Sequence, residues 1–112
     1  MPDADTSGSG LIESIRSQVL NESLLLTLHA QQEMVDEQIT LDQIIEAVSD
    51  AVLIEHYPEH RRGACCLLGG YSGNRPLHIV CTTDREILII ITVYEPRPPK
   101  WVTPFERRNR EL

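Results

Sequence analysis

The sequence has no apolar run of about 18 residues, the length that a membrane-spanning helix needs, and no segment with the pattern of a secretory signal peptide. Cysteine is also scarce: there are three, an odd number, and two are adjacent at Cys65 and Cys66. These absences argue against a membrane protein and against a secreted domain held together by disulfides. We therefore expect a reduced, soluble, cytoplasmic protein that does not bind membranes.

Basic residues are almost missing from the first half of the chain. Residues 1–60 contain one Arg and twelve acidic residues, whereas residues 61–112 contain nine basic and five acidic residues. The two halves carry formal charges of −11 and +4, which add up to the −7 of the whole chain. This asymmetry leaves room for a local basic site that binds an anion, although there is no long basic run. Mixed, solvated surface charge is the alternative.

The sequence also lacks a Gly-rich phosphate-binding loop and internal repeats, since Gly69 and Gly70 precede a turn and not a helix. A chain of 112 residues can bury a core without disulfides or metal, so we expect one domain. Residues 1–10 are acidic, small and Gly/Ser-rich, which predicts a disordered tail. The domain then covers residues 11–112, with a Pro-rich extension from residue 96.

Helical periodicity is present in three segments of the first half. The first helix is predicted from Leu11 to about Leu20. Thr27 can cap the second, and the run Leu24–Leu26 before it is compatible with either strand or helix. Thr40 and Gln43 form a capping box for the third, which should end near residues 49–50.

The second half is rich in β-branched residues and predicts strands. They cover residues 52–57, 64–70 and the two arms of a central hairpin, 75–83 and 86–94. With Asp84 and Arg85 as the hairpin turn, His78 lies opposite Ile91, Arg75 lies opposite Tyr94, and His78 and Tyr94 fall on different faces. Helices followed by strands predict an α+β fold, with N-terminal helices packed on one face of a roughly four-stranded, mostly antiparallel, twisted sheet.

After Glu95 the segment PRPPKWVTP contains four prolines, which cannot donate hydrogen bonds to a sheet. We predict that it leaves the sheet along an extended path anchored by Trp101. The basic end that follows is either free or closed over the sheet.

A family resemblance extends over roughly Thr27 to Arg108. It is carried by the ordered strings HAQQEM, EHYPEHRRGACCLLG, RPLHIVCTT and IITVYEPRPPKWV. They resemble a small prokaryotic family described as a domain of unknown function. The resemblance implies a fold grouped with RelE-like, MqsR-like, barnase-like and colicin-like ribonucleases. It also implies a toxin that cleaves RNA and has an antitoxin partner, of the zinc-finger type that accompanies MqsR.

A metal-independent ribonuclease needs a group that takes the 2′-hydroxyl proton, a group that protonates the leaving oxygen, and cations that stabilise the charged phosphorane. The candidate catalytic residues are His78, His29 and Tyr94. Histidine exchanges protons near neutral pH, and tyrosine can stack on a base or donate a proton. The candidate substrate-binding residues are Arg75, Arg61 and Arg62, because guanidinium groups bind phosphate in a bidentate manner. No cofactor is expected.

Each candidate also has a purely structural interpretation. His78 lies on the more aliphatic face of the predicted hairpin, where a buried core histidine is the alternative to a catalytic one. His29 lies near the start of a helix, where packing in the cap region is the alternative to a catalytic role. Arg75 and Tyr94 can form a cross-strand pair, and the Arg61-Arg62 pair can be solvated in its loop.

Two groups of residues carry donor atoms for a metal ion. His29, Glu33 and Glu37 share one helical face, for which a solvated acidic face is the simpler interpretation. The second group has the wrong spacing for a zinc knuckle, and adjacent cysteines on a strand point to opposite faces. It comprises His56, His60, Cys65, Cys66, His78 and Cys81. Small buried apolar cysteines are the simpler interpretation, and we predict no metal site.

Two functional hypotheses remain. The first is a RelE-like or MqsR-like RNA endonuclease whose site is covered by an antitoxin. The second is a non-catalytic module of the same fold, which binds a protein partner through its sheet rim or the segment around Trp101. The basic second half favours the first, whereas Glu33 and Glu37, at positions where relatives often carry Arg, favour the second. The oligomeric state stays open, a homodimer included.

Overall fold

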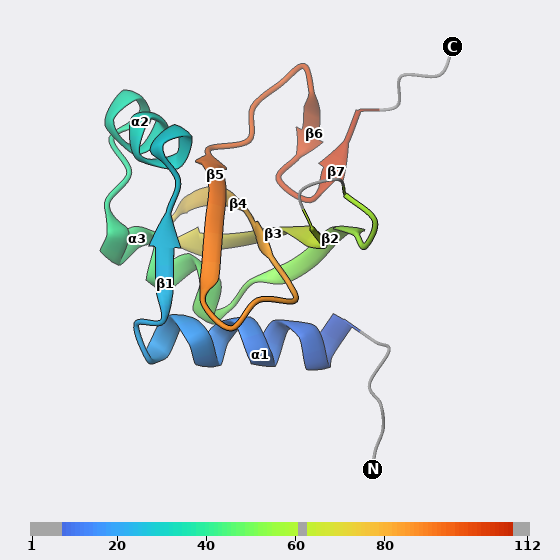
Figure 1. Cartoon of the computed structure of the whole chain (residues 1–112). Coiled ribbons are helices and arrows are strands. Elements are labelled where there is room, and N and C mark those ends of the chain that lie inside the picture. Colours follow the sequence, from blue (N-terminus) through green and yellow to red (C-terminus); the bar gives the residue numbers. More distant parts are fainter. Residues whose placement is uncertain (1–7, 61–62, 109–112) are drawn as a thin grey trace.

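The computed structural model describes residues 8–60 and 63–108 (Figure 1). The helices of this part of the chain are α1 (Gly8–Leu20), α2 (Leu28–Glu37) and α3 (Leu41–Ser49). Its strands are β1 (Leu24–Leu26), β2 (Val52–Tyr57), β3 (Cys65–Ser72), β4 (Arg75–Thr82), β5 (Leu88–Tyr94), β6 (Trp101–Thr103) and β7 (Glu106–Arg107).

The main sheet confirms the predicted α+β architecture and has one strand more than predicted. Its strand order is β1-β5-β4-β3-β2, and every neighbouring pair is antiparallel except β1 and β5. The additional strand is β1, the short Leu24–Leu26 run that is compatible with strand or helix in sequence. It adds to the sheet edge in parallel with Leu88–Ile90 of β5.

The helix ends follow local capping signals. Thr27 caps α2 by accepting a hydrogen bond from the Ala30 amide, and the predicted capping box of Thr40 and Gln43 is present at α3. Helix α1 begins at Gly8, three residues before its predicted start, so the end of the predicted tail is helical. Residues 1–7 of that tail lie outside the described residues.

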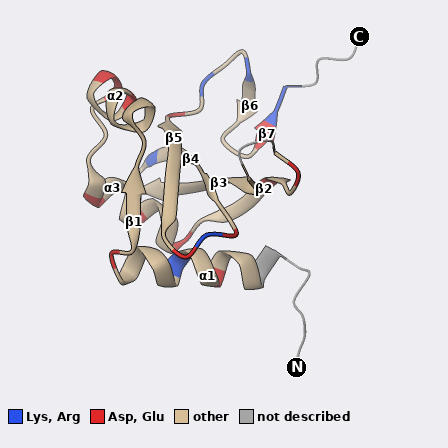
Figure 2. Ribbon diagram, viewed as in Figure 1, with Lys and Arg blue, Asp and Glu red and all other residues tan. Residues whose placement is uncertain are grey.

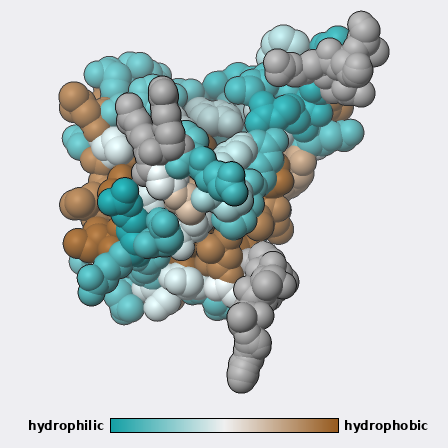
Figure 3. Space-filling model, turned by 45° about the vertical axis from the view of Figure 1, so that its right-hand side comes forward, coloured by the Kyte–Doolittle hydropathy of each residue, from teal (hydrophilic) through white to brown (hydrophobic). Residues whose placement is uncertain are grey.

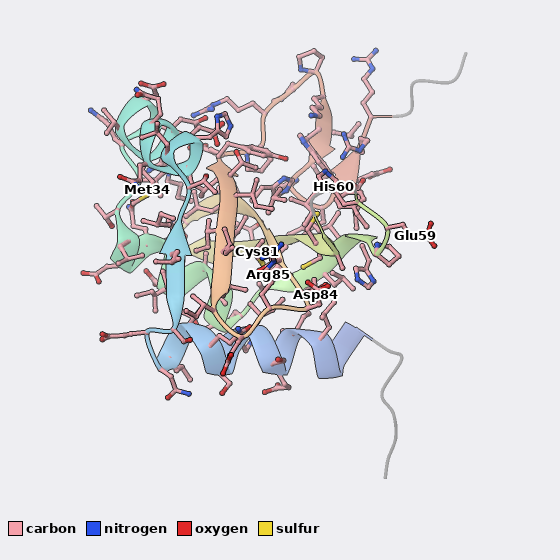
Figure 4. The ribbon with its side chains drawn as sticks, in the orientation of Figure 1. Met34, Glu59, His60, Cys81, Asp84 and Arg85 are labelled. Atoms are coloured by element: carbon pink, nitrogen blue, oxygen red, sulfur yellow. The ribbon has the colours of Figure 1, made fainter. Side chains whose placement is uncertain are left out.

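One core lies between the helices and one face of the sheet. In this core α3 packs closely on β3, and a Cβ on Gly70 would lie 2.1 Å from the carbonyl oxygen of Ala47. Cys66 and Cys81 form a buried cross-strand pair in the same core, and Cys81 lies in the middle of the sheet (Figure 4). The sheet side chains in this core are Cys66, Leu68, Leu77, Ile79, Cys81, Leu88, Ile90 and Val93.

The predicted register of the central hairpin is wrong. His78 lies opposite Tyr94 and not Ile91, and the register shifts by one residue between Val80 and Cys81. Arg75 lies opposite Ser72 in β3, not opposite Tyr94.

The physical reason is a connection longer than a two-residue turn. Residues 83–87 form a loop, and the Gln18 side chain of α1 donates hydrogen bonds to the carbonyl oxygens of Arg85 and Glu86 at 2.8 and 2.9 Å. These tertiary contacts and the bulge bring His78 and Tyr94 onto the same face of the sheet.

The Pro-rich segment closes over the sheet. We call residues 96–108 the flap; its strands β6 and β7 form a two-stranded antiparallel sheet (Figure 1). As predicted, Trp101 anchors this segment, with only 2% of its surface exposed. Phe105 packs against Tyr71 of β3, with ring centroids 5.8 Å apart. The flap therefore covers part of the sheet face opposite the helices.

Candidate functional site on the flap side of the sheet

Side chains that alternate with the core residues point toward the flap. Because successive residues of a strand face opposite sides, Glu55 and Tyr57 of β2 lie on the same face as His78 and Tyr94. The flap adds Arg107 to this group. We call the sheet surface with these five side chains the flap face.

His78 is fully buried between the sheet and the flap. Its Nε2 lies 2.5 Å from the Pro104 carbonyl oxygen, and its Nδ1 lies 3.2 Å from the Tyr94 hydroxyl. Because a carbonyl oxygen only accepts, Nε2 carries the proton and Nδ1 accepts from the Tyr94 hydroxyl. The Trp101 ring packs edge-on against the imidazole at 4.4 Å. Both ring nitrogens are thus engaged, and His78 fastens the flap to the sheet.

The burial of His78 predicts a pH-dependent stability. Burial lowers the pKa of His78 below its ordinary value of 6.5, so the unfolded chain binds this proton more tightly than the folded protein does. The resulting stabilisation is complete above that value and is lost as the pH falls below it. We expect the urea midpoint to decrease between about pH 7.5 and about pH 5.

The matched variants separate this effect from other titrations. His78→Gln should flatten the pH dependence more than His29→Gln, which changes a side chain that is 66% exposed and lies outside the flap face. Identical pH slopes for both variants would contradict the assignment to His78.

Glu55, Tyr57 and Arg107 form a connected polar group. Arg107 donates two hydrogen bonds to the Glu55 carboxylate, from Nε at 2.9 Å and from Nη2 at 2.8 Å. The Tyr57 hydroxyl donates to the same carboxylate. The guanidinium of Arg107 also lies over the Trp101 ring, 4.7 Å from its centroid, which is a cation–π contact.

The contacts within this group set its protonation. The hydrogen bond from Arg107 lowers the pKa of Glu55 below its ordinary value of 4.5, so the carboxylate is ionised at neutral pH. Burial, and then the hydrogen bond to Glu55, raise the pKa of Tyr57 to about 12. The group thus contains a carboxylate that can accept a proton, a phenol that carries one, and a cation.

A cavity of about 450 Å³ opens beside Arg107 in the flap. It is lined by Pro99, Lys100, Arg107 and Arg108. The Arg108 amide donates to the Lys100 carbonyl oxygen at 2.8 Å, which holds the two cationic residues side by side. Neither has an ion-pair partner among residues 8–60 and 63–108. Figure 2 shows the Lys and Arg positions of the flap above the main sheet. Lys100 and Arg108 therefore carry positive charge at the cavity that the described chain does not neutralise, while most of the surface that lines the cavity is apolar.

Arg75 is not part of the flap face. Its guanidinium donates to the carbonyl oxygens of Glu37 and Gln38 at 2.6 and 2.9 Å, and to the Glu95 carboxylate at 2.9 Å. These carbonyls lie at the C-terminal end of α2, where Gln38 is the cap residue. Arg75 thus ties α2 to the sheet, and its donors are engaged away from His78.

The acidic face of α2 contacts the edge of β5. Glu33 accepts hydrogen bonds from the Val93 amide and the Thr92 hydroxyl, and Glu37 accepts from the Glu95 amide. The bonds from the Val93 and Glu95 amides occupy backbone donors at the end of β5 and just after it, beyond the end of β1, where the edge would otherwise be unpaired. His29 is mostly exposed and lies 3.4 Å from Glu33. Glu33 and Glu37 are therefore structural contacts rather than a solvated acidic face.

The other predicted residues are placed as follows. Arg61 and Arg62 lie outside the described residues. Cys66 and Cys81 face the helices, whereas Cys65 is buried on the opposite face, as alternation along a strand predicts.

No group of three or more His, Cys, Asp or Glu side chains in the described part of the chain is arranged to hold a metal ion. No described helix is both long and apolar enough to cross a membrane.

A comparison with protein families identifies the family of this chain. Residues 26–95 match the family described as Domain of unknown function (DUF4258). The chain belongs to the DUF4258 family. Searches of curated proteins and of solved structures give no match.

The DUF4258 match divides the site between two parts of the chain. Glu55, Tyr57, His78 and Tyr94 lie within the matched residues 26–95, whereas Arg107 and the rest of the flap follow them. The polar group on the flap face therefore combines strands of the DUF4258 domain with a segment beyond the match.

His78 and Tyr94 are predicted site residues, and the structure brings them together. Glu55, Tyr57 and Arg107 are site residues that were not predicted. A signal for two of them is present in the strand VLIEHY, because residues two apart on a strand share a face. The contribution of Arg107 has no local signal, since it is 52 residues from Glu55.

Proposed function

We propose that this DUF4258 protein is a metal-independent RNA endonuclease of the RelE-like or MqsR-like kind, with Glu55, Tyr57 and Arg107 at its centre. We further propose that it acts in the cytoplasm as the toxin of a toxin–antitoxin pair, with an antitoxin of the zinc-finger type as partner. The observation that supports the proposal is the hydrogen-bonded contact of a carboxylate, a phenol and a guanidinium beside a cationic cavity, on the sheet face opposite the helices.

The chemistry of these groups matches the needs of RNA cleavage by the adjacent 2′-hydroxyl. Glu55 takes the 2′-hydroxyl proton, and the 2′-oxygen bonds to phosphorus. The bond from phosphorus to the 5′-oxygen breaks, and that oxygen takes a proton from Tyr57. The products are a 2′,3′-cyclic phosphate and a 5′-hydroxyl, and the proton on Glu55 returns to the Tyr57 oxygen that contacts it. Arg107 and Lys100 stabilise the negative charge that develops on the phosphorane.

His78 has a different role in this proposal from the catalytic one expected from sequence. It is enclosed and has both nitrogens engaged, so it positions the flap that carries Arg107. Tyr94 is partly exposed beside it and offers a ring on which an RNA base can stack.

A second candidate function is a non-catalytic module that binds a protein. It is favoured by the structural use of His78 and Arg75, and by large apolar side chains left exposed near the β1 edge. Leu25, Leu28 and Val35 are 57%, 81% and 72% exposed. Figure 3 shows apolar surface at the left of the molecule. The flap also exposes apolar side chains, since Val102 is 61% and Phe105 41% exposed. At the flap, the cationic side chains of Lys100, Arg107 and Arg108 favour an anionic RNA ligand over an apolar protein surface.

The test is cleavage of unmodified single-stranded RNA by the purified full chain in the presence of EDTA. We expect products that end in a 2′,3′-cyclic phosphate and begin with a 5′-hydroxyl, because the proposed groups need no metal ion. Induction of the protein in bacteria should also arrest growth and degrade RNA. Intact RNA in both assays would overturn the nuclease and leave the protein-binding module.

A further inference from the structure

The Glu55–Arg107 ion pair couples the cationic cavity to the candidate base. Arg107 lines the cavity with Lys100 and Arg108, yet two of its donors bind Glu55. The same carboxylate also accepts from Tyr57. Glu55 therefore accepts hydrogen bonds from both Arg107 and Tyr57. Its negative charge also offsets part of the positive charge that Arg107 would otherwise present to the cavity.

A phosphodiester can take the place of the Glu55 carboxylate on Arg107. Both groups present two oxygens with shared negative charge, and both match the fork of a guanidinium. The carboxylate side chain is 27% exposed and the Arg107 side chain 34%, so the pair is accessible from solvent. Lys100 and Arg108 line the cavity next to it and provide further attraction for an anion.

We propose that the flap cavity is the phosphate subsite for single-stranded RNA, and that a bound phosphodiester displaces Glu55 from Arg107 and so frees the carboxylate to act as the base. This inference rests on the proposed function. It adds the class of ligand, single-stranded RNA, and a condition for activity, because Glu55 becomes available as the base only when the phosphate is bound. The cavity, with a volume of about 450 Å³ and a lining of flap residues, suits a flexible single strand better than a stiff duplex.

The probe is a labelled single-stranded RNA of about 12 nucleotides with a 2′-O-methyl group on every sugar, which binds but cannot be cleaved. Glu55→Gln should bind it about tenfold more tightly than the wild type, because Arg107 loses its carboxylate partner. The dependence of log K on log salt should also become steeper by about 0.7, the value for one more phosphate contact on a single strand. Adding Arg107→Gln to Glu55→Gln should remove both gains.

The matched control is Glu59→Gln. Glu59 is exposed in the turn after β2 and gives the same change in net charge without touching Arg107 (Figure 4). It should change the affinity by less than about twofold. Equal gains for Glu55→Gln and Glu59→Gln, or no gain for Glu55→Gln, would overturn the exchange.

A second measurement needs no variant. The ¹³C signal of the Glu55 carboxyl, titrated in the wild-type protein with and without the uncleavable RNA, reports the loss of Arg107 as a donor. RNA should raise the pKa of Glu55, and an unchanged titration would overturn the exchange. Cleavage of unmodified RNA is scored separately. If Glu55→Gln tightens binding but the wild type cleaves no RNA, the displacement of Glu55 by phosphate is supported and the nuclease proposal is wrong. If the wild type cleaves RNA but Glu55→Gln binds it no more tightly, the nuclease proposal is supported and the displacement of Glu55 is wrong.

Discussion

Glu55→Gln is expected to lower the rate of RNA cleavage by about 10²- to 10⁴-fold, the usual contribution of a positioned general base. Glutamine keeps the shape of the side chain and can still accept hydrogen bonds from Arg107 and Tyr57, but it cannot take the 2′-hydroxyl proton. The single-turnover rate on unmodified RNA, with enzyme in excess, measures the chemical step without product release.

This loss should occur although the same variant binds RNA more tightly. Binding and cleavage would thus change in opposite directions, which a merely misfolded variant does not produce. Glu59→Gln is the control and should cleave at the wild-type rate. If Glu55→Gln cleaves RNA at a rate within about threefold of the wild-type rate, Glu55 is not the general base. The base would then be another side chain of the flap face.

Gly70→Ala is expected to destabilise the fold by about 3 kcal/mol or more, a large effect for a single methyl group. A Cβ at this position would lie 2.1 Å from the carbonyl oxygen and 2.9 Å from the carbonyl carbon of Ala47. These are backbone atoms of α3, so relief requires the whole helix to move away from β3. The free energy of unfolding from urea titration measures the loss.

The neighbouring glycine provides the control. A Cβ on Gly69 would meet the tip of the Ile54 side chain at 2.6 Å and the Phe105 ring at 3.2 Å. These atoms belong to side chains that can move, and one of them is in the flap. Gly69→Ala should therefore cost less than Gly70→Ala. Our account of the α3–β3 contact would be wrong if Gly70→Ala stayed within about 1 kcal/mol of the wild type.

Elements with a strong local signal were predictable. Thr40 and Gln43 cap α3 with contacts made inside one turn of helix, so the residues alone determine the start of the helix. Gly73 has a positive φ of 62° in the turn between β3 and β4, which explains why the Gly73-Asn74 pair predicts that hairpin. Glu55 and Tyr57 could have been grouped by strand alternation alone.

Elements that depend on distant contacts were not predictable in the same way. The loop over residues 83–87 is held by Gln18 of α1, and this contact lengthens the connection that the sequence predicts as a two-residue turn. The resulting register places His78 beside Tyr94. Arg75 has the residue type of a phosphate ligand, but the position of the end of α2 assigns it to a structural role.

The sequence by itself determined the α+β class, the helix caps and the tight β3–β4 turn, because each depends on patterns or contacts of residues close together in the chain. Only the tertiary structure decided that the flap closes over the sheet, that His78 is enclosed, and that Arg107 meets Glu55. Those outcomes depend on which surfaces of distant segments fit together, and periodicity along the chain carries no information about that fit.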